Sequence, residues 1–411
     1  MHISPITCYR PAPHAASTFA SLPYDVFDRA EAAAYVAVHP QSFLAIDRPE
    51  TAFGPEQDMY APEVYQKAGE LIRQKAYEGT LVKDVTPCLY LYRLKQGEHT
   101  QIGVVAACSV AEYDDGTIRR HEKTRPEKTA DRVNHIRATG AQTGPVFVAN
   151  RDSMAIDIIV DAARAASPLY GFTDEQGVRQ TVWRIARPVA VEALATSFST
   201  VPFAYIADGH HRASAAAQVC HDQHAQTGSD EELPADGFLA VLFPASQLNV
   251  MAYNRVVADT NGLDEQGLVV ALEQAGFEVG PAQDEPVEPA GARVFGLYAF
   301  GAWRPLNYNG PAPDPSDDPA GALDVSILQD LVLGPILGVD DPRTSERISF
   351  VGGVEGTAGL QRRAGSDGVA FTLCPTTVDD LMRVSDAGLL MPPKSTWFEP
   401  KLRSGLFIRR V

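Results

Sequence analysis

The stretch that most constrains the fold is residues 204–217, AYIADGHHRASAAA, where a short apolar run ends in Asp208 and Gly209 and an alanine-rich run begins. This order predicts a strand, a sharp turn and a helix. Gly209 tolerates the positive φ that a tight turn needs. The chain therefore contains at least one strand–turn–helix unit, with polar side chains gathered at its turn.

Two histidines and an arginine, His210, His211 and Arg212, occupy the first turn of the expected helix. A helix N-terminus presents unpaired N–H groups and a partial positive charge, and Arg212 adds a planar set of donors that suits phosphate or carboxylate. The alternative interpretation is a polar first turn that only caps its helix. Because the end of a strand is the usual place of ligand sites in α/β folds, we expect Gly209, His210, His211 and Arg212 to bind an anion.

His221 and His224 follow on the same predicted helix, which raises the question of a shared metal site. On an α-helix the rise from His210 to His221 is about 16 Å, far beyond the reach of one ion. We therefore interpret His221 and His224, with Asp222 between them, as a solvated helix end.

A second polar segment, residues 118–132 (IRRHEKTRPEKTADR), carries more cations than anions in a chain whose formal net charge is −17. This local excess indicates a pocket for a small anionic ligand, although a solvated face is the alternative for single cations such as Arg125 and Lys128. Glu122 lies among these cations, where a carboxylate can act as a general base or hold a cation that bridges phosphates.

Further along, residues 127–139 predict a helix on which Asp131, Arg132 and His135 share a face. Other helices are expected over 30–37, 61–77, 156–166, 188–197, 323–337 and 376–387, and strands over 88–94, 101–110, 145–148, 181–185, 238–243, 250–257, 349–354 and 368–374. The segment Lys394–Lys401 folds back over the site or caps the sheet, and both interpretations stay open.

Five motifs are spread over the chain: LPYDV at 22–26, HEKTRPEK at 121–128, DGHHR at 208–212, YNRVV at 253–257 and MPPKSTWFEPK at 391–401. Together they resemble the bacterial and archaeal domain of unknown function 1015 family, nearly end to end. That family has no known function, so this resemblance implies no activity.

The motif at 208–212 is also similar to the Gly-His-Xaa-Arg motif of the ParB/sulfiredoxin superfamily, in which a helix N-terminus after a strand binds nucleotide phosphates. Its members include free-serine kinases, a sulfinic-acid reductase that uses ATP, and CTP-hydrolysing DNA partition proteins. The resemblance implies an α+β (mixed α/β) fold with a ParB/sulfiredoxin-like nucleotide-binding core, and ATP or ADP with Mg²⁺ as ligands. The serine kinases use a glutamate base, and Glu122 is the candidate for that role.

Two superfamily activities are not expected. Sulfiredoxin has a cysteine in its phosphate motif, where this chain has His210 and His211. The partition proteins bind DNA through a separate helical region, and this acidic chain shows no comparable basic segment. We therefore expect a small phosphorylated ligand as partner and no nucleic acid.

Length and composition bound the rest. With 411 residues, 45% of them apolar, the chain has room for two domains, and we expect residues 1–260 to carry the site and residues 261–411 to form a C-terminal α+β region. No apolar run approaches the roughly 20 residues of a membrane span, and the start lacks a signal-peptide pattern, so we expect a cytoplasmic protein with no membrane partner. The five scattered cysteines are expected to be free and buried.

The leading hypothesis is a nucleotide-dependent kinase of a small hydroxylated metabolite, with free L-serine as the first candidate. Gly209, His210, His211 and Arg212 would hold the phosphates, Asp208 would orient Mg²⁺ or the acceptor hydroxyl, and Glu122 would be the base. Arg125 and Lys128 are weaker candidates for binding phosphate or a substrate carboxylate. The chain has no Walker-type motif, which excludes a P-loop enzyme.

Two alternatives from other classes stay open. A nucleotide-sensing module would have the same pocket without chemistry. A phosphatase or other hydrolase would use His210 or His211 as nucleophile or acid, without a nucleotide.

Overall fold

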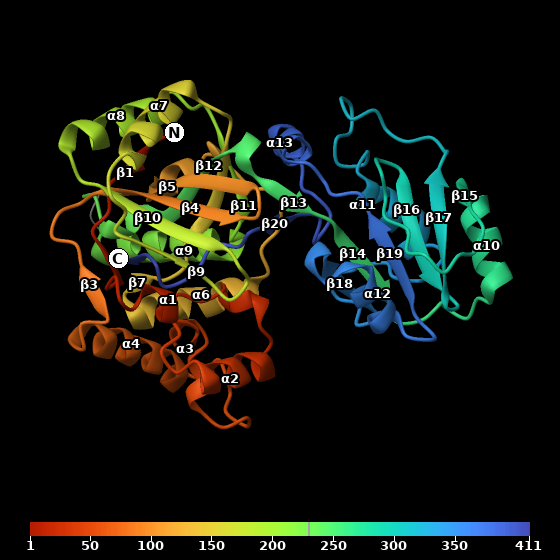
Figure 1. Ribbon diagram of the computed structural model, residues 1–411, viewed down its shortest axis with the longest axis horizontal. Coiled ribbons are helices and arrows are strands. Elements are labelled where there is room, and N and C mark those ends of the chain that lie inside the picture. Colours follow the sequence, from red (N-terminus) through yellow and green to blue (C-terminus); the bar gives the residue numbers. More distant parts are fainter. Residues whose placement is uncertain (229–230) are drawn as a thin grey trace. The chain divides into compact units, whose positions relative to one another are not determined.

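The computed structural model describes residues 1–228 and 231–411, which form two compact units (Figure 1). One comprises Met1–Leu248 and Pro400–Val411, and the other Asn249–Glu399. The boundary expected after residue 260 differs from this division. Strand β14 (Tyr253–Val257) pairs within the second unit, and strand β21 (Ile408–Arg410) pairs within the first.

A nine-stranded mixed sheet forms the centre of the first unit. Its strand order is β6-β11-β8-β12-β5-β4-β10-β9, with β1 added beside β5. The pairs β6–β11 and β8–β12 are parallel and the others antiparallel. The strands are β1 (Ile3–Ser4), β4 (Leu89–Gln96), β5 (His99–Ser109), β6 (Ile118–Arg119), β8 (Val146–Asn150), β9 (Tyr170–Thr173), β10 (Arg179–Ile185), β11 (Ala204–Asp208) and β12 (Gly237–Pro244).

Helices surround this sheet, and α7 and α8 pack together beside it (Figure 1). The helices are α1 (Ala16–Phe19), α2 (Arg29–Val38), α3 (Leu44–Asp47), α4 (Pro62–Tyr77), α5 (Val110–Asp114), α6 (Pro126–Thr139), α7 (Met154–Arg164), α8 (Pro188–Ser199) and α9 (His210–Thr227). Proline at the first position starts α4, α6 and α8, where a missing N–H costs no hydrogen bond. Gly140, with φ +61°, ends α6.

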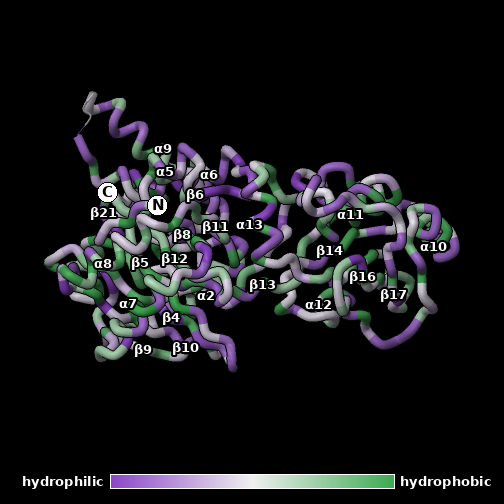
Figure 2. The backbone as a smooth tube through the Cα atoms, turned by 90° about the horizontal axis from the view of Figure 1, so that it is seen from above, coloured by the Kyte–Doolittle hydropathy of each residue, from purple (hydrophilic) through white to green (hydrophobic). Residues whose placement is uncertain are grey.

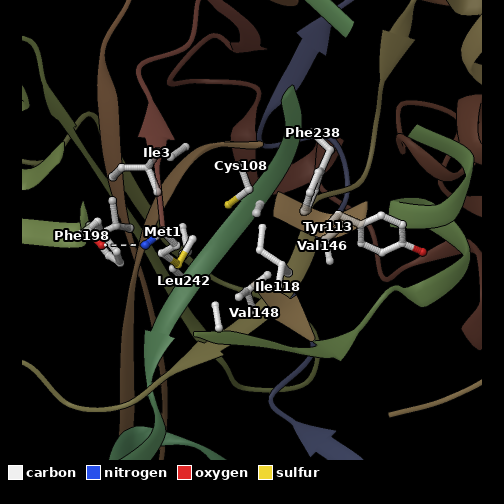
Figure 3. Packing of buried hydrophobic residues seen from close by; sticks show 14 of the residues in the cluster. Met1, Ile3, Cys108, Tyr113, Ile118, Val146, Val148, Phe198, Phe238 and Leu242 are labelled. Carbon is white, nitrogen blue, oxygen red and sulfur yellow. Dashed lines mark hydrogen bonds between the residues drawn. The ribbon is translucent and has the colours of Figure 1, made fainter. Parts of the chain in front are cut away.

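The core of the first unit is built from the alternating apolar residues of its strands. Figure 2 shows hydrophobic residues along β4 and β5. The buried side chain of Met1 lies beside Leu242 and Phe198, and its amino group donates a hydrogen bond to the Phe198 carbonyl at 3.4 Å (Figure 3). The N-terminal residue is therefore part of the packed interior.

A smaller four-stranded sheet holds the end of the chain in the first unit. Its order is β3-β2-β21-β7, with β2 (Cys8–Pro11), β3 (Leu81–Lys83) and β7 (Ala141–Gln142). Just before β21, Gly405 has φ +84°, and a Cβ there would lie 2.6 Å from the ring of Phe43. The last residues are thus fitted closely against the unit.

The second unit contains an antiparallel six-stranded sheet of order β15-β17-β16-β19-β14-β18, and a two-stranded pair β13–β20. Its elements are β13 (Asn249–Met251), β14 (Tyr253–Val257), α10 (Glu265–Gln274), β15 (Phe277–Val279), β16 (Val294–Ala299), β17 (Ala302–Tyr308), α11 (Asp324–Leu328), β18 (Ile348–Gly352), α12 (Gly356–Ala364), β19 (Val369–Leu373), α13 (Val378–Asp386) and β20 (Trp397–Glu399). Phe300 and Gly301, both with positive φ, form the tight turn between β16 and β17.

Two expected elements of the second unit are broken in the structure. The strand expected over 250–257 is divided at Ala252 into β13 and β14, which belong to different sheets. The helix expected over 323–337 is regular only over α11 and continues as a π-helix over Gln329–Leu333. Pro335 lies just after its last turn and has no backbone N–H with which to continue the helical hydrogen bonds.

The α+β class is confirmed in both units. Within the described residues, none of the helices combines the length and apolar character that crossing a bilayer requires. All five cysteines are free, and four are buried, while Cys374 is half-buried.

Candidate functional site

The turn expected at residues 208–212 has the predicted geometry. Asp208 ends β11, Gly209 has φ +96° and is the N-cap of α9, and His210 is the first residue of the helix. A Cβ on Gly209 would lie 3.0 Å from the guanidinium of Arg212. Because Gly209 has neither a side chain nor an ordinary φ, it lets Arg212 fold back beside the helix start.

Two cations face the carboxylate of Asp208. Lys401 Nζ donates to Asp208 Oδ2 at 3.1 Å, and Arg212 Nη2 lies 3.8 Å from Oδ1. Burial by itself would raise the pKa of Asp208, but the charges of Lys401 and Arg212 outweigh it and hold the pKa well below its usual range. Asp208 is therefore ionised. Its Oδ1 lies 3.8 Å from Arg212 Nη2, which is beyond hydrogen-bond distance.

Glu122 comes to the same helix start from the loop between β6 and α6. Its Oε2 lies 3.9 Å from Nδ1 of His210. The ring of His121 meets that of His210 edge to face, with centroids 4.4 Å apart. Nε2 of His210 is buried and has no hydrogen-bond partner within residues 1–228 and 231–411. A carboxylate and two imidazoles thus meet beside the first turn of α9.

Both imidazoles are neutral near pH 7. Burial lowers the pKa of His121 from 6.5 to about 4, and a hydrogen bond from its ring to the backbone of Ile206 opposes this shift only in part. Burial and the neighbouring His121 lower the pKa of His210 well below its usual value. A neutral histidine can accept a proton or bind a ligand without adding positive charge.

These lowered pKa values predict an acid-sensitive fold. The unfolded chain gains a proton on His121 below pH 6.5, whereas the folded chain gains it only near pH 4, so stability falls as pH falls through this window. We expect His121, which is 3% exposed, to make the protein about 2 kcal/mol less stable at pH 5 than at pH 7.

Urea denaturation of the wild type and His121→Gln at pH 5, 6 and 7 measures this contribution. We expect a flatter pH dependence in His121→Gln, with His14→Gln, at an exposed position, as the matched control. Equal pH slopes in the wild type and His121→Gln would contradict the assignment.

Of the other predicted phosphate ligands, His211 and Arg125 contact each other at the site, whereas Lys128 does not lie there. The backbone N–H of Arg125, the N-cap of α6, donates to Nε2 of His211 at 3.0 Å, which joins α6 to α9 at the site. Lys128 is exposed on α6. The structure therefore brings Glu122, Asp208, Gly209, His210, His211 and Arg212 together, with Arg125 at their edge and Lys128 pointing into solvent.

Two groups of side chains have metal-ligating atoms within 4.8 Å of one another. One comprises His121, Glu122 and His210, and the other Cys220, His224 and Asp236. In the second group His224 Nε2 contacts Asp236 Oδ1 at 2.6 Å, whereas His221 Nε2 contacts Asp114 at 2.8 Å. His221 and His224 thus have separate acidic partners and do not act as a pair.

Carboxylate oxygens such as those of Asp208 are ligands of the kind that Mg²⁺ prefers. Mg²⁺ usually binds one or two carboxylates together with substrate phosphates, and imidazoles suit other metals better. Asp208 can offer Oδ1 while Oδ2 keeps its contact with Lys401. Glu122 belongs to the group with His121 and His210, which does not include Asp208.

Sequence reasoning missed two members of this site. His121 begins the motif at 121–128 but was given no role, although its position in a cation-rich segment before α6 could have marked it. Lys401 lies at the end of the segment Lys394–Lys401, for which two interpretations were open, and its contact with Asp208 joins residues 193 positions apart in the sequence. No local sequence pattern predicts the contact between Lys401 and Asp208.

Comparisons with known proteins give one family and several distant structures. The family described as "Protein of unknown function (DUF1015)" matches residues 3–326. No curated protein matches the chain.

Three solved structures are similar at low identity. SbnI with C-terminal truncation from Staphylococcus aureus is 13% identical, with a TM-score of 0.38 over 74% of this chain and 87% of that one. A free serine kinase mutant in complex with ADP is 12% identical, with a TM-score of 0.35 over 72% and 87%. A conserved hypothetical protein from Pyrococcus furiosus is 12% identical, with a TM-score of 0.36 over 75% and 95%. At this level of similarity, the chemistry of the site has to be argued from its own residues.

Proposed function

This chain belongs to the family of proteins of unknown function DUF1015, and we propose that it is a nucleotide-dependent kinase that phosphorylates a small hydroxylated metabolite, with free L-serine as the first candidate. This proposal includes a more general one, namely that the first unit of the chain binds a nucleotide. One observation carries it. The N-terminus of α9, Arg212 and Lys401 meet at one buried turn beside the carboxylate of Glu122.

This arrangement suits the polyphosphate of a nucleotide. The first turn of a helix supplies N–H donors and partial positive charge, and a guanidinium and an ammonium add two full charges. Gly209 has no side chain, so phosphate oxygens can approach the backbone closely at this position. Gly209, His210, His211 and Arg212 are the proposed phosphate ligands, and Arg125 and Lys128 are outer candidates.

Phosphoryl transfer needs a base for the acceptor proton and charge neutralisation for the phosphates. The acceptor hydroxyl would give its proton to Glu122 as its oxygen bonds to the γ-phosphorus, and the bond to the bridging oxygen would break to release the nucleoside diphosphate. Mg²⁺ bound with the nucleotide neutralises charge on the phosphates. Asp208 would hold this ion through Oδ1, and neutral His210, with Nδ1 3.9 Å from Glu122 Oε2, would leave the charge of that carboxylate in place.

The nucleotide site is tested by thermal unfolding with ATP, ADP, CTP or GTP in the presence of Mg²⁺. A ligand at one hundred times its Kd stabilises the fold by about 2.7 kcal/mol, so binding raises Tm measurably. We expect one nucleotide to raise Tm in the wild type and in Arg137→Ala, a matched control on the exposed face of α6. The shift should vanish in Arg212→Ala.

The same measurement separates the alternatives. A shift that depends on Arg212, without transfer to any hydroxylated acceptor, would favour a nucleotide-sensing module. A wild type with no shift for any nucleotide would overturn both the kinase and the module. The hydrolase would then be tested by phosphate release from phosphorylated metabolites, with His210 as the candidate residue, because His211 Nε2 already accepts from Arg125.

A further inference from the structure

A cavity with both apolar and charged side chains in its lining lies in the first unit beside Arg212. Its volume is about 30 Å³, measured over the positions that the centre of a water-sized sphere can take. On that measure one water needs roughly 10–15 Å³, so the cavity takes a small molecule and is too small for a nucleotide. Its polar side chains are those of Tyr24, Asp47, Arg132, His135, Gln142, Thr143 and Arg212, and apolar residues make up most of the remaining lining.

The carboxylate of Asp47 is the negative charge of this cavity. Asp47 ends α3 and is 2% exposed. Its Oδ1 accepts from Thr143 Oγ1 at 2.8 Å, but its Oδ2 is buried without a hydrogen-bond partner in the part of the chain that the structure describes. A buried carboxylate oxygen that accepts no hydrogen bond lowers the stability of the fold, so a bound molecule with a donor group would stabilise the protein at Oδ2.

Two guanidinium groups supply positive charge to the same cavity. Arg132 donates hydrogen bonds through Nε and Nη2 to Asp131 Oδ2, at 3.0 and 2.7 Å. Its Nη1 has only a 3.5 Å contact with the Asp47 carbonyl. Arg212 donates through Nη1 to the carbonyl of Pro145 and keeps donors on its other nitrogens. Both arginines can therefore still donate to an anion.

The other polar groups of the lining add no charge. Nε2 of His135 contacts the carbonyl of Ile46 at 2.8 Å. Burial and the nearby Arg132 lower the pKa of His135, so its ring is neutral. The ring of Tyr24 lies under the Arg132 guanidinium at 3.9 Å, and burial raises the pKa of its hydroxyl. Opposite charges thus face the cavity from Asp47 and from the two arginines.

We propose that this cavity binds the zwitterion of a small α-amino acid, whose ammonium group donates to Asp47 Oδ2 and whose carboxylate accepts from Arg132 and Arg212. An anion alone would leave Asp47 without a donor, and a cation alone would face two guanidiniums. A molecule with both charges satisfies both sides. The inference rests on the proposed function for the role of this amino acid as phosphoryl acceptor, but its binding can be measured in the absence of a nucleotide.

Calorimetric titration without nucleotide tests the charge requirement on the wild type. The ligands are glycine, L-alanine, L-serine and L-threonine, with ethanolamine and 3-hydroxypropionate as analogues of L-serine that lack its carboxylate and its amino group. We expect at least one amino acid to bind and each analogue to bind at least tenfold more weakly than L-serine or not at all. Failure of every amino acid at millimolar concentration, or equal binding of an analogue, would overturn the inference and leave water as the occupant.

A variant locates the binding in this cavity. Asp47→Asn keeps the shape of the side chain and should weaken amino acid binding at least tenfold, with the nucleotide-induced change in Tm retained. Asp222→Asn, on the exposed face of α9, is the matched control and should bind as the wild type. Unchanged binding by Asp47→Asn would overturn the placement. If that variant does not fold, Thr143→Val, which removes the partner of Oδ1, replaces it with the same expectation.

The outcomes for this cavity and for the kinase are separable. Amino acid binding without any nucleotide shift would refute the proposed function and support the cavity site. A nucleotide shift that depends on Arg212, without amino acid binding, would refute the cavity site and leave the proposed function intact.

Discussion

Replacing Glu122 with glutamine is expected to lower the rate of phosphoryl transfer about 10²–10⁴-fold, while the nucleotide-induced rise in Tm is retained. Glutamine keeps the shape of glutamate but cannot take the proton of the acceptor hydroxyl. Glu122 lies 3.9 Å from Nδ1 of a buried, neutral His210, so its charge is not neutralised by a cationic imidazole. Single-turnover transfer from labelled ATP, run beside the thermal shift, measures both quantities.

Glu127→Gln is the matched control for this prediction. Glu127 lies in the first turn of α6 and is exposed, so its loss changes the charge of the same segment without touching the helix start of α9. We expect its transfer rate to stay near that of the wild type. A Glu122→Gln enzyme with the full rate would show that Glu122 is not the base, and loss of the thermal shift would show that it acts in nucleotide binding.

The turn of the candidate site could be predicted because its causes are local. Only glycine easily adopts the φ of +96° found at Gly209, and an apolar run before it and an alanine-rich run after it are enough to specify a strand and a helix. The placement of Glu122 next to His210 was harder to predict. It depends on β6 lying parallel to β11, so that the loop after β6 emerges beside the start of α9.

The cavity could not be predicted for a related reason. Asp47 ends the four-residue helix α3, and its partner Thr143 belongs to the segment after α6. Nothing in the sequence around Asp47 marks it as buried, because its burial results from packing between α3, α4 and α6. Arg132 was placed on one face with Asp131 and His135, which the structure shows as buried, but the spacing of a helix cannot say what that face contacts.

Helices and strands could be predicted where the apolar pattern alone determined them. The prediction was wrong where a second effect, such as a proline or tertiary strand pairing, competed with that pattern. The apolar pattern over 323–337 favours a helix throughout, but Pro335 lacks the N–H needed to continue it, and the last turn has π geometry over Gln329–Leu333. The apolar run over 250–257 has uniform β propensity. Its division at Ala252 reflects pairing with two different sheets, and such pairing is set by tertiary contacts.

Replacing Arg403 with methionine is expected to destabilise the protein by about 3 kcal/mol, near the lower end of the range for breaking a buried ion pair. Arg403 Nε and Nη2 donate to Asp174 Oδ2 at 3.0 and 2.6 Å, and the two side chains are 2% and 8% exposed. Methionine fills much of the space but leaves a buried carboxylate without its cation. Asp174 keeps donors from the backbone of Val178 and from Gln180, which limits the loss.

A double-mutant cycle decides whether the charge or the packing of Arg403 matters. If the uncompensated carboxylate causes the loss, Arg403→Met combined with Asp174→Asn should be more stable in urea than Arg403→Met alone. Equal stability of the two would assign the effect to lost packing. The pair also bears on the site, because Arg403 follows closely after Lys401, whose ammonium group contacts Asp208. Releasing Arg403 should therefore weaken nucleotide binding as well as the fold, whereas a purely structural pair would leave the Kd of the folded protein unchanged.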